Sequence, residues 1–507
     1  MKENGKKLGL VTAAATLAMA AGFASGQCQT SIGPDVIVGD VQVSGGSYTG
    51  LPNYTASGGI DATSLGTTSC NIGNAQLLWI SGNNQHPVIG GNLYQYREFG
   101  NYATFEQVGQ SWLKHGFFAL SQNLCCNSCQ GTNGTRLGIG CSDPYTADRN
   151  GTQSSAGPKW QVNASTGFFT YPPANPTYSG VTARRLQFNT ADTVSSNTAP
   201  WFGQAGSAGT AVRHFGEAQY VTPDDAAAGN KFNNSSYRWM TLSGGPTNFT
   251  ANLITANPGP GLVAMNRQKA SVEAWPLIDP QVLQDSVIVA NAIPIASDPY
   301  KGEGKYIVSS RAYDLGNGTW HYEYSIFNQC SHRSASSFDV PVPAGVVVTD
   351  IGFHDVDYRN GDGEGNVSRS GTDWATDTSG NKVGWATESF GVNLNANALR
   401  WGTTYNFRFV ANTPPTDSMS TVGLWRPAAA GEPANFEARI VGPSAPVGEP
   451  CVADWDGDGA VGVPDLFAFL SSWFAEDPDA VNFGGTAGVP AIFAFLTAWF
   501  AHGTGPC

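Results

Sequence analysis

The sequence has few charged residues and, beyond its N-terminus, no long apolar segment. Charged residues make up 13% of the 507 residues, and acidic residues outnumber basic ones, which gives a net charge of −13. An acidic chain repels nucleic acid phosphates and anionic lipids, so no nucleic acid partner is expected. After residue 26 no stretch reaches 18 apolar residues, so no transmembrane segment is expected in the mature chain.

Several catalytic motifs are also missing. The sequence contains no H-E-x-x-H pair, no G-x-S-x-G elbow and no P-loop, so it gives no sign of a zincin, an α/β-hydrolase or a P-loop nucleotide site. Glycoside hydrolysis needs two carboxylates placed by the fold, and the sequence alone does not select a pair. Whether the chain is an enzyme therefore stays open at this stage.

The first 26 residues have the three parts of a signal peptide. Lys2, Lys6 and Lys7 precede a largely apolar run at 8–21, and small residues follow at 24–26. We therefore expect a secreted protein, either extracellular or associated with the cell surface. All nine cysteines follow this segment, and export makes disulfides permissible, although the odd number leaves one thiol over.

The composition favours a mostly β protein with short strands and many turns. We expect a β-rich region of unknown function at 27–299, formed of one or two domains, a β-sandwich domain at 300–443 and a linker at 444–450. In the sandwich, the runs 306–313 and 320–327 flank Gly316-Asn317-Gly318, which is a hairpin signal. The runs 338–341, 346–353 and 404–410 continue the pattern. A single convincing helix start in the first region is at 222–225, where Thr222 precedes Pro223.

The segment 451–507 contains an internal repeat. Gly-Val-Pro at 462–464, Phe-Ala-Phe-Leu at 467–470 and Trp-Phe-Ala at 473–475 all recur 26 residues later. Two unrelated segments would not match in this way, so we expect a duplicated loop–helix unit. Both helices carry apolar residues at i, i+3, i+4 and i+7, beginning at Leu466 in the first. Their apolar residues are more than so small a module needs for its own core, and some are expected to contact a partner.

The first loop has the spacing of an EF-hand calcium site. Asp454, Asp456 and Asp458 occupy positions 1, 3 and 5, Ala460 offers its backbone carbonyl at position 7, and Asp465 occupies position 12. Ca²⁺ requires six to eight hard oxygen ligands, which these groups can supply.

The second loop has lost this ligand set. Ala480, Asn482, Gly484 and Ala491 stand at the equivalent positions, so only one side-chain oxygen remains. The sequence predicts one Ca²⁺, bound in the first repeat. Cys451 and Cys507 bracket the module and are expected to form a disulfide.

This segment resembles a dockerin, specifically the tail of secreted bacterial proteins described as GC-type dockerin domain-anchored. The resemblance rests on the D-x-D-x-D-G loop, the duplicated loop–helix unit and the flanking cysteines. It implies an EF-hand-type α-helical module that binds a cohesin-like or other surface or scaffold protein through residues 451–507. Loop positions 10 and 11, which help to choose the partner in that family, are Val463 and Pro464 here, in place of small hydroxyl residues.

The region 27–299 also resembles an uncharacterised group of secreted bacterial proteins. The resemblance implies no activity. The matching stretches are 84–87 (NQHP), 112–117 (WLKHGF), 140–145 (GCSDPY) and 217–225 (EAQYVTPDD).

Two further groups of residues could bind metal. His86, His115 and His214 lie in or beside the matching stretches, and imidazoles on β-scaffold loops can hold copper or zinc. Alternatively, they cap or pack. Asp355, Asp357, Asp362 and Glu364 surround a Gly-rich turn and form either a second calcium site or a solvated acidic loop.

Three functions remain open for the large region. It is a non-catalytic surface or matrix protein, a carbohydrate-active enzyme or carbohydrate-binding protein in polysaccharide degradation, or a metal-dependent extracellular enzyme. An aromatic-lined cleft with paired carboxylates favours the second, and three converging histidines favour the third.

Overall fold

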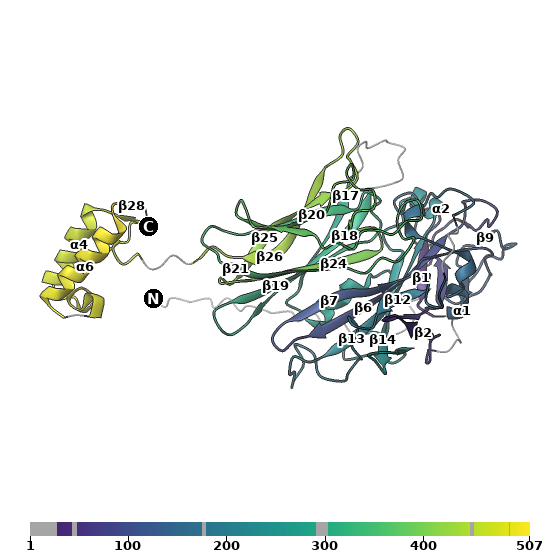
Figure 1. Ribbon diagram of the computed structural model, residues 1–507, viewed down its shortest axis with the longest axis horizontal. Helices are drawn as coiled ribbons and strands as arrows, with labels where there is room; N and C mark the ends of the chain where they lie inside the picture. Colours follow the sequence, from purple (N-terminus) through teal and green to yellow (C-terminus); the bar gives the residue numbers. More distant parts are fainter. Residues whose placement is uncertain are drawn as a thin grey trace, which may run out of the picture. The chain divides into compact units, whose positions relative to one another are not determined.

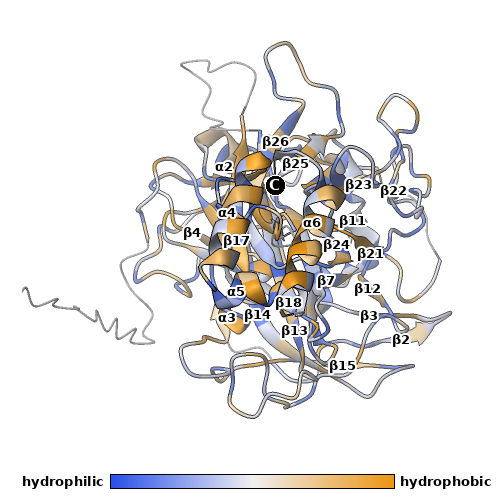
Figure 2. Cartoon of the chain, turned by 90° about the vertical axis from the view of Figure 1, so that its left-hand side faces the viewer, coloured by the Kyte–Doolittle hydropathy of each residue, from blue (hydrophilic) through white to orange (hydrophobic). Residues whose placement is uncertain are grey.

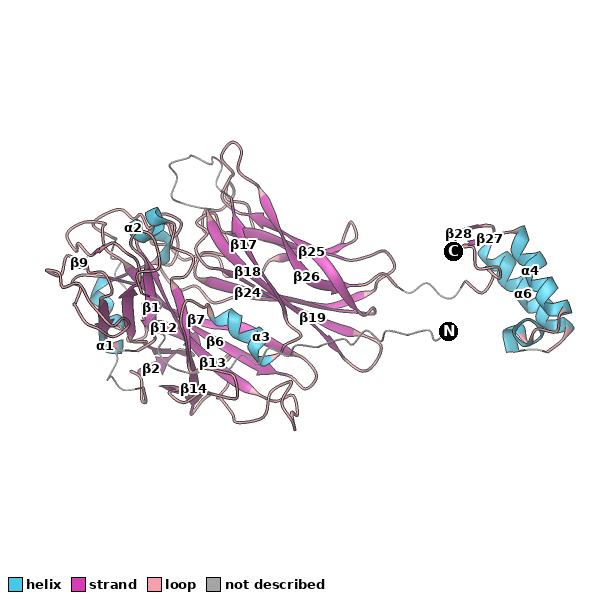
Figure 3. Ribbon diagram, turned by 180° about the vertical axis from the view of Figure 1, so that it is seen from behind, coloured by secondary structure: helices cyan, strands magenta, loops and turns pink. Residues whose placement is uncertain are grey.

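The computed structural model describes residues 28–42, 48–174, 179–290, 303–446, 451–485 and 487–506. The expected signal peptide and residues 447–450 of the expected linker lie outside the described residues. The chain divides into two compact units, Met1–Ser444, here the β unit, and Ala445–Cys507, here the helical unit (Figure 1). Strands dominate the first and helices the second (Figure 3), so the chain is mostly β, as the sequence predicts.

An antiparallel sheet of eleven strands forms the first half of the β unit. Its longest pairing joins two strands far apart in the sequence, with Val212 opposite Arg97 and Val221 opposite Val88. In order across the sheet, the strands are β15 (Thr250–Leu253), β14 (Ser235–Ser243), β13 (Val212–Val221), β6 (Val88–Glu98), β7 (Ala103–Gln110), β12 (Leu186–Asn189), β3 (Ile60–Thr63) and β2 (Tyr54–Ser57), with β8 (Leu113–His115), β11 (Ala156–Gly157) and β16 (Met265–Asn266) attached beside them.

A three-stranded sheet covers one face of the eleven-stranded sheet. It consists of β1 (Val36–Asp40), β4 (Thr67–Asn71) and β10 (Ser142–Tyr145), with a short pair, β5 (Leu77–Leu78) and β9 (Arg136–Leu137), nearby in sequence. Val36 and Val38 pack with Leu93 and Leu242 in a buried core between the two sheets.

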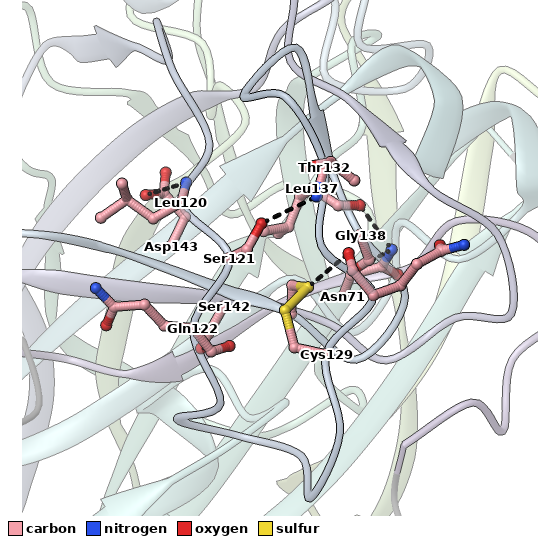
Figure 4. The surroundings of a disulfide bond; sticks show 12 residues. Asn71, Leu120, Ser121, Gln122, Cys129, Thr132, Leu137, Gly138, Ser142 and Asp143 are labelled. Carbon is pink, nitrogen blue, oxygen red and sulfur yellow. Dashed lines mark hydrogen bonds between the residues drawn. A yellow bond between two sulfur atoms is a disulfide. The ribbon is translucent and has the colours of Figure 1, made fainter.

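Three disulfides fasten the loops beside this small sheet. They join Cys28 to Cys126, Cys70 to Cys125, and Cys129 to Cys141. Figure 4 shows the surroundings of the last of these, where the backbone N–H of Asn71 donates to the Cys141 carbonyl (3.0 Å). Cys330 is buried and free. Cys451 is disulfide-bonded, but Cys507 lies outside the described residues, so the pairing of these two stays a prediction.

The second half of the β unit is a sandwich of two five-stranded sheets. One sheet has the order β17 (Leu283–Val289), β18 (Gly304–Asp314), β19 (Trp320–Asn328), β24 (Thr403–Ala411) and β21 (Val348–His354); the other has the order β22 (Ala375–Asp377), β23 (Lys382–Ala386), β20 (Ala335–Pro341), β25 (Pro415–Leu424) and β26 (Asn435–Pro443). The expected hairpin is present, with Gly316 and Gly318 at φ of 75° and 82°. The boundary expected at residue 299 falls between the paired strands β17 and β18, so the sandwich begins earlier than expected.

Both faces of β19 are buried. Tyr322 and Tyr324 point into the sandwich core, whereas Phe327 packs with Tyr94 and Phe105 of the large sheet. The side-chain oxygen Oε1 of Gln107 accepts a hydrogen bond from the backbone N–H of Thr404 (2.7 Å) across this second interface. The two expected β-rich regions are therefore joined into one unit.

Helices in the β unit are short: α1 (Ala147–Asn150), α2 (Pro223–Ala228) and α3 (Trp275–Ile278). The expected helix start is confirmed, since Thr222 is the N-cap residue of α2 and Gly229, at φ 82°, ends it. The Thr222 hydroxyl donates to the Asp224 carboxylate (2.9 Å) and does not cap a backbone N–H.

The helical unit is built around two equivalent helices. Its elements are β27 (Ala460–Val461), α4 (Val463–Phe474), α5 (Pro478–Val481), α6 (Val489–His502) and β28 (Gly505–Pro506). The rings of Phe469 and Phe495, which are equivalent in the two repeats, stack at 4.0 Å. Trp473 Nε1 donates to the Gly488 carbonyl (3.3 Å) and Trp499 Nε1 donates to the Gly462 carbonyl (2.8 Å), so each repeat binds the helix start of the other. The duplicated helices are thus confirmed.

Among the described residues no single helix is long and apolar enough to cross a membrane. The segments 478–485 and 489–502, which meet at a bend of 71°, would satisfy the length and composition only when taken together.

Candidate calcium site, docking face and histidine cleft

The acidic loop before α4 folds back on Asp454. The carboxylate of Asp454 accepts hydrogen bonds from the backbone N–H groups of Gly457 (2.9 Å), Asp458 (3.1 Å) and Gly459 (2.9 Å). Gly459 has a φ of 87°, a conformation that costs glycine little. The loop then continues through β27, where the N–H of Ala460 donates to the carboxylate of Asp458 (2.9 Å).

Three of the four predicted carboxylates lie together. Asp454, Asp456 and Asp458 offer carboxylate oxygens within 4.8 Å of one another, and no other His, Cys, Asp or Glu side chains form such a group in the part of the chain that the structure describes. Partial desolvation and the negative charges of Asp458, Asp465 and Asp454 raise the pKa of Asp456. A group of hard, mutually repelling carboxylate oxygens fits Ca²⁺.

Asp465 is placed differently from these three. It is buried, and its carboxylate accepts hydrogen bonds from the backbone N–H groups of Trp455 (2.7 Å), Asp456 (3.1 Å) and Gly462 (2.7 Å). Burial raises the pKa of Asp465, but these donors outweigh it and hold the pKa below its usual value. Asp465 therefore ties the acidic loop to the start of α4. A carboxylate has about four acceptor positions, and three donors contact Asp465, so one position is left that could bind a cation.

The equivalent loop of the second repeat has another conformation. Ala480 is buried within α5, and the side chain of Asn482 donates to the Pro478 carbonyl (2.8 Å). Ala491 is fully buried where the first repeat has Asp465. A methyl group in the core thus replaces the carboxylate that ties the first loop to its helix.

Six exposed apolar side chains lie on α4 and α6 and occupy equivalent positions in the two repeats. We call them the docking face: Val463, Phe467 and Phe474 from α4, and Val489, Phe493 and Phe500 from α6. The four phenylalanines are 65–75% exposed. Figure 2 shows the strongly apolar character of both helices. Each helix therefore buries one apolar face in the unit and presents a second to solvent.

The structure brings together two of the three histidines. Nε2 of His86 lies 2.9 Å from Nδ1 of His115. His214 is fully buried elsewhere, where its ring nitrogens contact Ser196 (2.8 Å) and Gln95 (3.3 Å). The three-histidine metal site considered from the sequence is therefore not assembled.

His86 and His115 line a cleft of about 440 Å³ in the β unit. Phe117 and Tyr171 also line it, and both are exposed. None of the lining residues is a carboxylate, so the paired carboxylates that would favour a glycosidase are not in this cleft.

The acidic residues around the Gly-rich turn do not form a second cluster. Asp355 accepts from Asn397, whereas Glu364 lies 3.6 Å from Arg426. The carboxylate of Asp362 accepts from the indole of Trp112. These carboxylates are separately partnered, and the second calcium site considered from the sequence is not formed.

Comparison with known proteins places the chain in no family. No protein-family model matches it, and no curated protein matches it.

Proposed function

We propose that this is a secreted, non-catalytic surface or matrix protein that is held to a cohesin-like or other scaffold protein by its helical unit. The observation that carries this proposal is the docking face, which repeats the same exposed apolar side chains on two equivalent helices. Exposed apolar surface of this kind is costly for a free protein and marks interaction sites. Apolar anchors along helix faces are also typical of helix-mediated recognition.

Calcium would neutralise the acidic loop of the helical unit and stabilise it. Asp454, Asp456 and Asp458, with Asp465 and the carbonyl of Ala460, would hold one Ca²⁺, which supplies the positive charge that offsets their mutual repulsion. Because Asp465 already ties the loop to the start of α4, an ion bound here would stabilise the end of the helix that carries Val463. Calcium is therefore expected to strengthen docking.

The proposed location rests on the disulfides together with the sequence. The β unit contains three disulfides. Disulfides persist in oxidising compartments and are rare in reducing ones. The N-terminal signal-like segment agrees with export.

Calorimetric titration of the mature, oxidised chain with Ca²⁺ tests the calcium part. We expect one ion per chain, and we expect the double substitution Asp454→Ala/Asp465→Ala to abolish binding. Asn482→Ala is the matched control, because it removes the one remaining side-chain oxygen of the second loop and should leave the titration unchanged. Two ions per chain, or none at millimolar calcium, would contradict the prediction.

A carbohydrate-binding role for the β unit is the second candidate. The exposed rings of Phe117 and Tyr171 beside the cleft favour it, because aromatic faces stack on sugar rings. The third candidate, a metal-dependent enzyme, rests on His86 and His115 alone, since His214 lies elsewhere.

A further inference from the structure

The histidine cleft is lined by two cationic side chains. Lys114 extends from β8, and Arg149 lies on α1. Neither belongs to an ion pair with a carboxylate among the described residues. In a chain with a net charge of −13, two unpaired cations in one cleft form a local positive site.

Lys114 is the more constrained of the two cations. Its side chain is buried, and Nζ donates to the hydroxyl of Ser155. Burial and the positive charge of Arg149 both lower the pKa of Lys114. A buried ammonium group with a cationic neighbour gains most from a bound anion, because the anion supplies the missing counter-charge.

The histidine pair adds an oriented hydrogen-bond acceptor. Nδ1 of His86 lies 3.1 Å from the carbonyl of Ile80, which can only accept, so this nitrogen carries the proton. Nε2 of His86 then accepts from Nδ1–H of His115. Burial, with the neighbouring His86 and Lys114, lowers the pKa of His115 to about 4, so the ring is neutral at pH 7. Its Nε2 is left as an acceptor for a ligand hydroxyl.

The positive charge of Arg149 lowers the pKa of Asp143, but this carboxyl group does not line the cleft. Asp143 is buried and accepts a hydrogen bond from the backbone N–H of Leu120 (3.1 Å). Burial outweighs the effect of Arg149 and raises the pKa of Asp143 to about 7.

We propose that this cleft binds an acidic sugar unit. Lys114 and Arg149 hold its carboxylate or sulfate group, and His115 accepts a hydrogen bond from a ring hydroxyl. Phe117 and Tyr171 contact the apolar face of the ring. The cleft volume of about 440 Å³ lies in the ordinary range for small-ligand sites, and its hydroxyl groups add polar partners.

Binding of oligosaccharides to the mature full chain tests this proposal. The probes are a uronate-containing oligosaccharide, its sulfated counterpart and the neutral parent, each titrated with and without a calcium chelator. We expect at least one acidic probe to bind at least about tenfold more tightly than the neutral parent, since a hydrogen bond to a charged group is worth roughly 1.5–3 kcal/mol. The carboxylated and sulfated probes identify which anion is preferred.

Four variants locate the site. We expect Arg149→Gln and Lys114→Gln each to weaken binding about tenfold. Arg149 is exposed, so its replacement should leave the fold intact even if Lys114→Gln does not fold. Arg136→Gln, which removes an exposed arginine of β9 outside the cleft, is the matched control and should bind as the unaltered chain does. Tyr171→Ala should weaken oligosaccharide binding without weakening the binding of inorganic sulfate.

The proposal is overturned if Arg149→Gln binds the acidic probes as tightly as Arg136→Gln does. Equal affinity for the neutral parent would also overturn it, as would equal affinity for single-stranded DNA, because both would show that no acidic sugar is selected. Loss of binding on calcium chelation would place the site in the helical unit and not in this cleft. If the acidic probes still bind when calcium is chelated, sugar binding by the cleft is established independently of whether the docking proposal holds.

Discussion

At the scale of single residues, burial decides what each histidine can do. His214 is fully buried between Ser196 and Gln95, and burial, with the charge of Arg213, lowers its pKa to about 3. The ordinary value is about 6.5. A neutral ring with both nitrogens engaged by the protein is a structural histidine. For His214 the structure therefore supports the alternative stated in the sequence analysis, that the histidine packs and does not bind metal.

His214 should make the β unit less stable in acid. Between pH 6.5 and 3 the unfolded chain binds a proton that the folded chain does not, so the free energy of unfolding falls as the pH is lowered through this window. From pH 7 to pH 5 the loss due to His214 should be about 2 kcal/mol. Urea unfolding of the unaltered chain and of His214→Gln should show this difference, because the variant lacks the titrating ring. His502→Gln, at an exposed position, serves as the control.

A pH dependence in His214→Gln as steep as that of the unaltered chain would contradict the prediction. The other buried histidines titrate equally in both proteins, so they cancel in the comparison.

Sequence reasoning identified part of the candidate sites because of spacing alone. Asp454, Asp456 and Asp458 follow one another at intervals of two residues, so local geometry brings them together. Lys114 and Arg149 are 35 positions apart and meet only because the chain returns to β8 through β11. No local sequence pattern predicts that these two side chains line one cleft.

At the scale of elements, alternation along the strands predicted which side chains enter the sandwich. Tyr405, Phe407 and Phe409, which alternate along β24 within the expected run 404–410, all lie in its core. The intervening Asn406 is also fully buried, and its side chain donates to the backbone carbonyl of Phe105 (3.1 Å) and to Glu323 (3.1 Å). Period-two alternation separates two faces but does not say what covers the second.

In the helical unit, neighbouring phenylalanines of one helix should behave in opposite ways. Phe469→Ala removes a buried ring that stacks on Phe495, so we expect a loss of about 3–5 kcal/mol in the free energy of unfolding. Phe467→Ala removes an exposed ring and should change stability by less than about 0.5 kcal/mol. Thermal unfolding followed by tryptophan fluorescence compares the two.

Phe467 and its equivalent in the second repeat, Phe493, test docking. Phe467→Ala combined with Phe493→Ala should weaken binding to an immobilised cohesin-type domain or surface scaffold while the unit remains folded. If the doubly substituted chain docks normally, the face that the two helices expose is not the docking face.

At the scale of the whole molecule, two units of different construction share one chain. The β unit depends on packed sheets and disulfides, whereas the helical unit depends on two stacked helices and an acidic loop. The sequence predicted a linker at 444–450 before the repeat at 451–507, and the division between the units falls at the start of that linker. The sequence did not predict that the first two expected regions would merge, since the joining contacts, such as Gln107 with Thr404, span 297 residues.

Scanning calorimetry of the mature chain should therefore give two transitions, and calcium should move only one. A hundredfold excess of Ca²⁺ over its dissociation constant adds about 2.7 kcal/mol to the unit that binds it. For a unit of this size that corresponds to a rise in Tm of roughly 10 °C or more. The transition of the β unit should stay in place. A single transition that moves as a whole would show that the two units unfold together.

The pairing of β6 with β13 also constrains the order in which the two units can fold during synthesis. Val88 must find Val221, and residue 107 must find residue 404, so little of the β unit can be completed until most of the chain has been made. Contacts between such distant residues form slowly, and strand edges stay exposed until their partner strands have been made. The helical unit comes last in the chain, but its described strand pairing, Ala460 with Pro506, spans far fewer residues than the pairing of Gln107 with Thr404. In newly made copies the helical unit should thus finish folding before the β unit does.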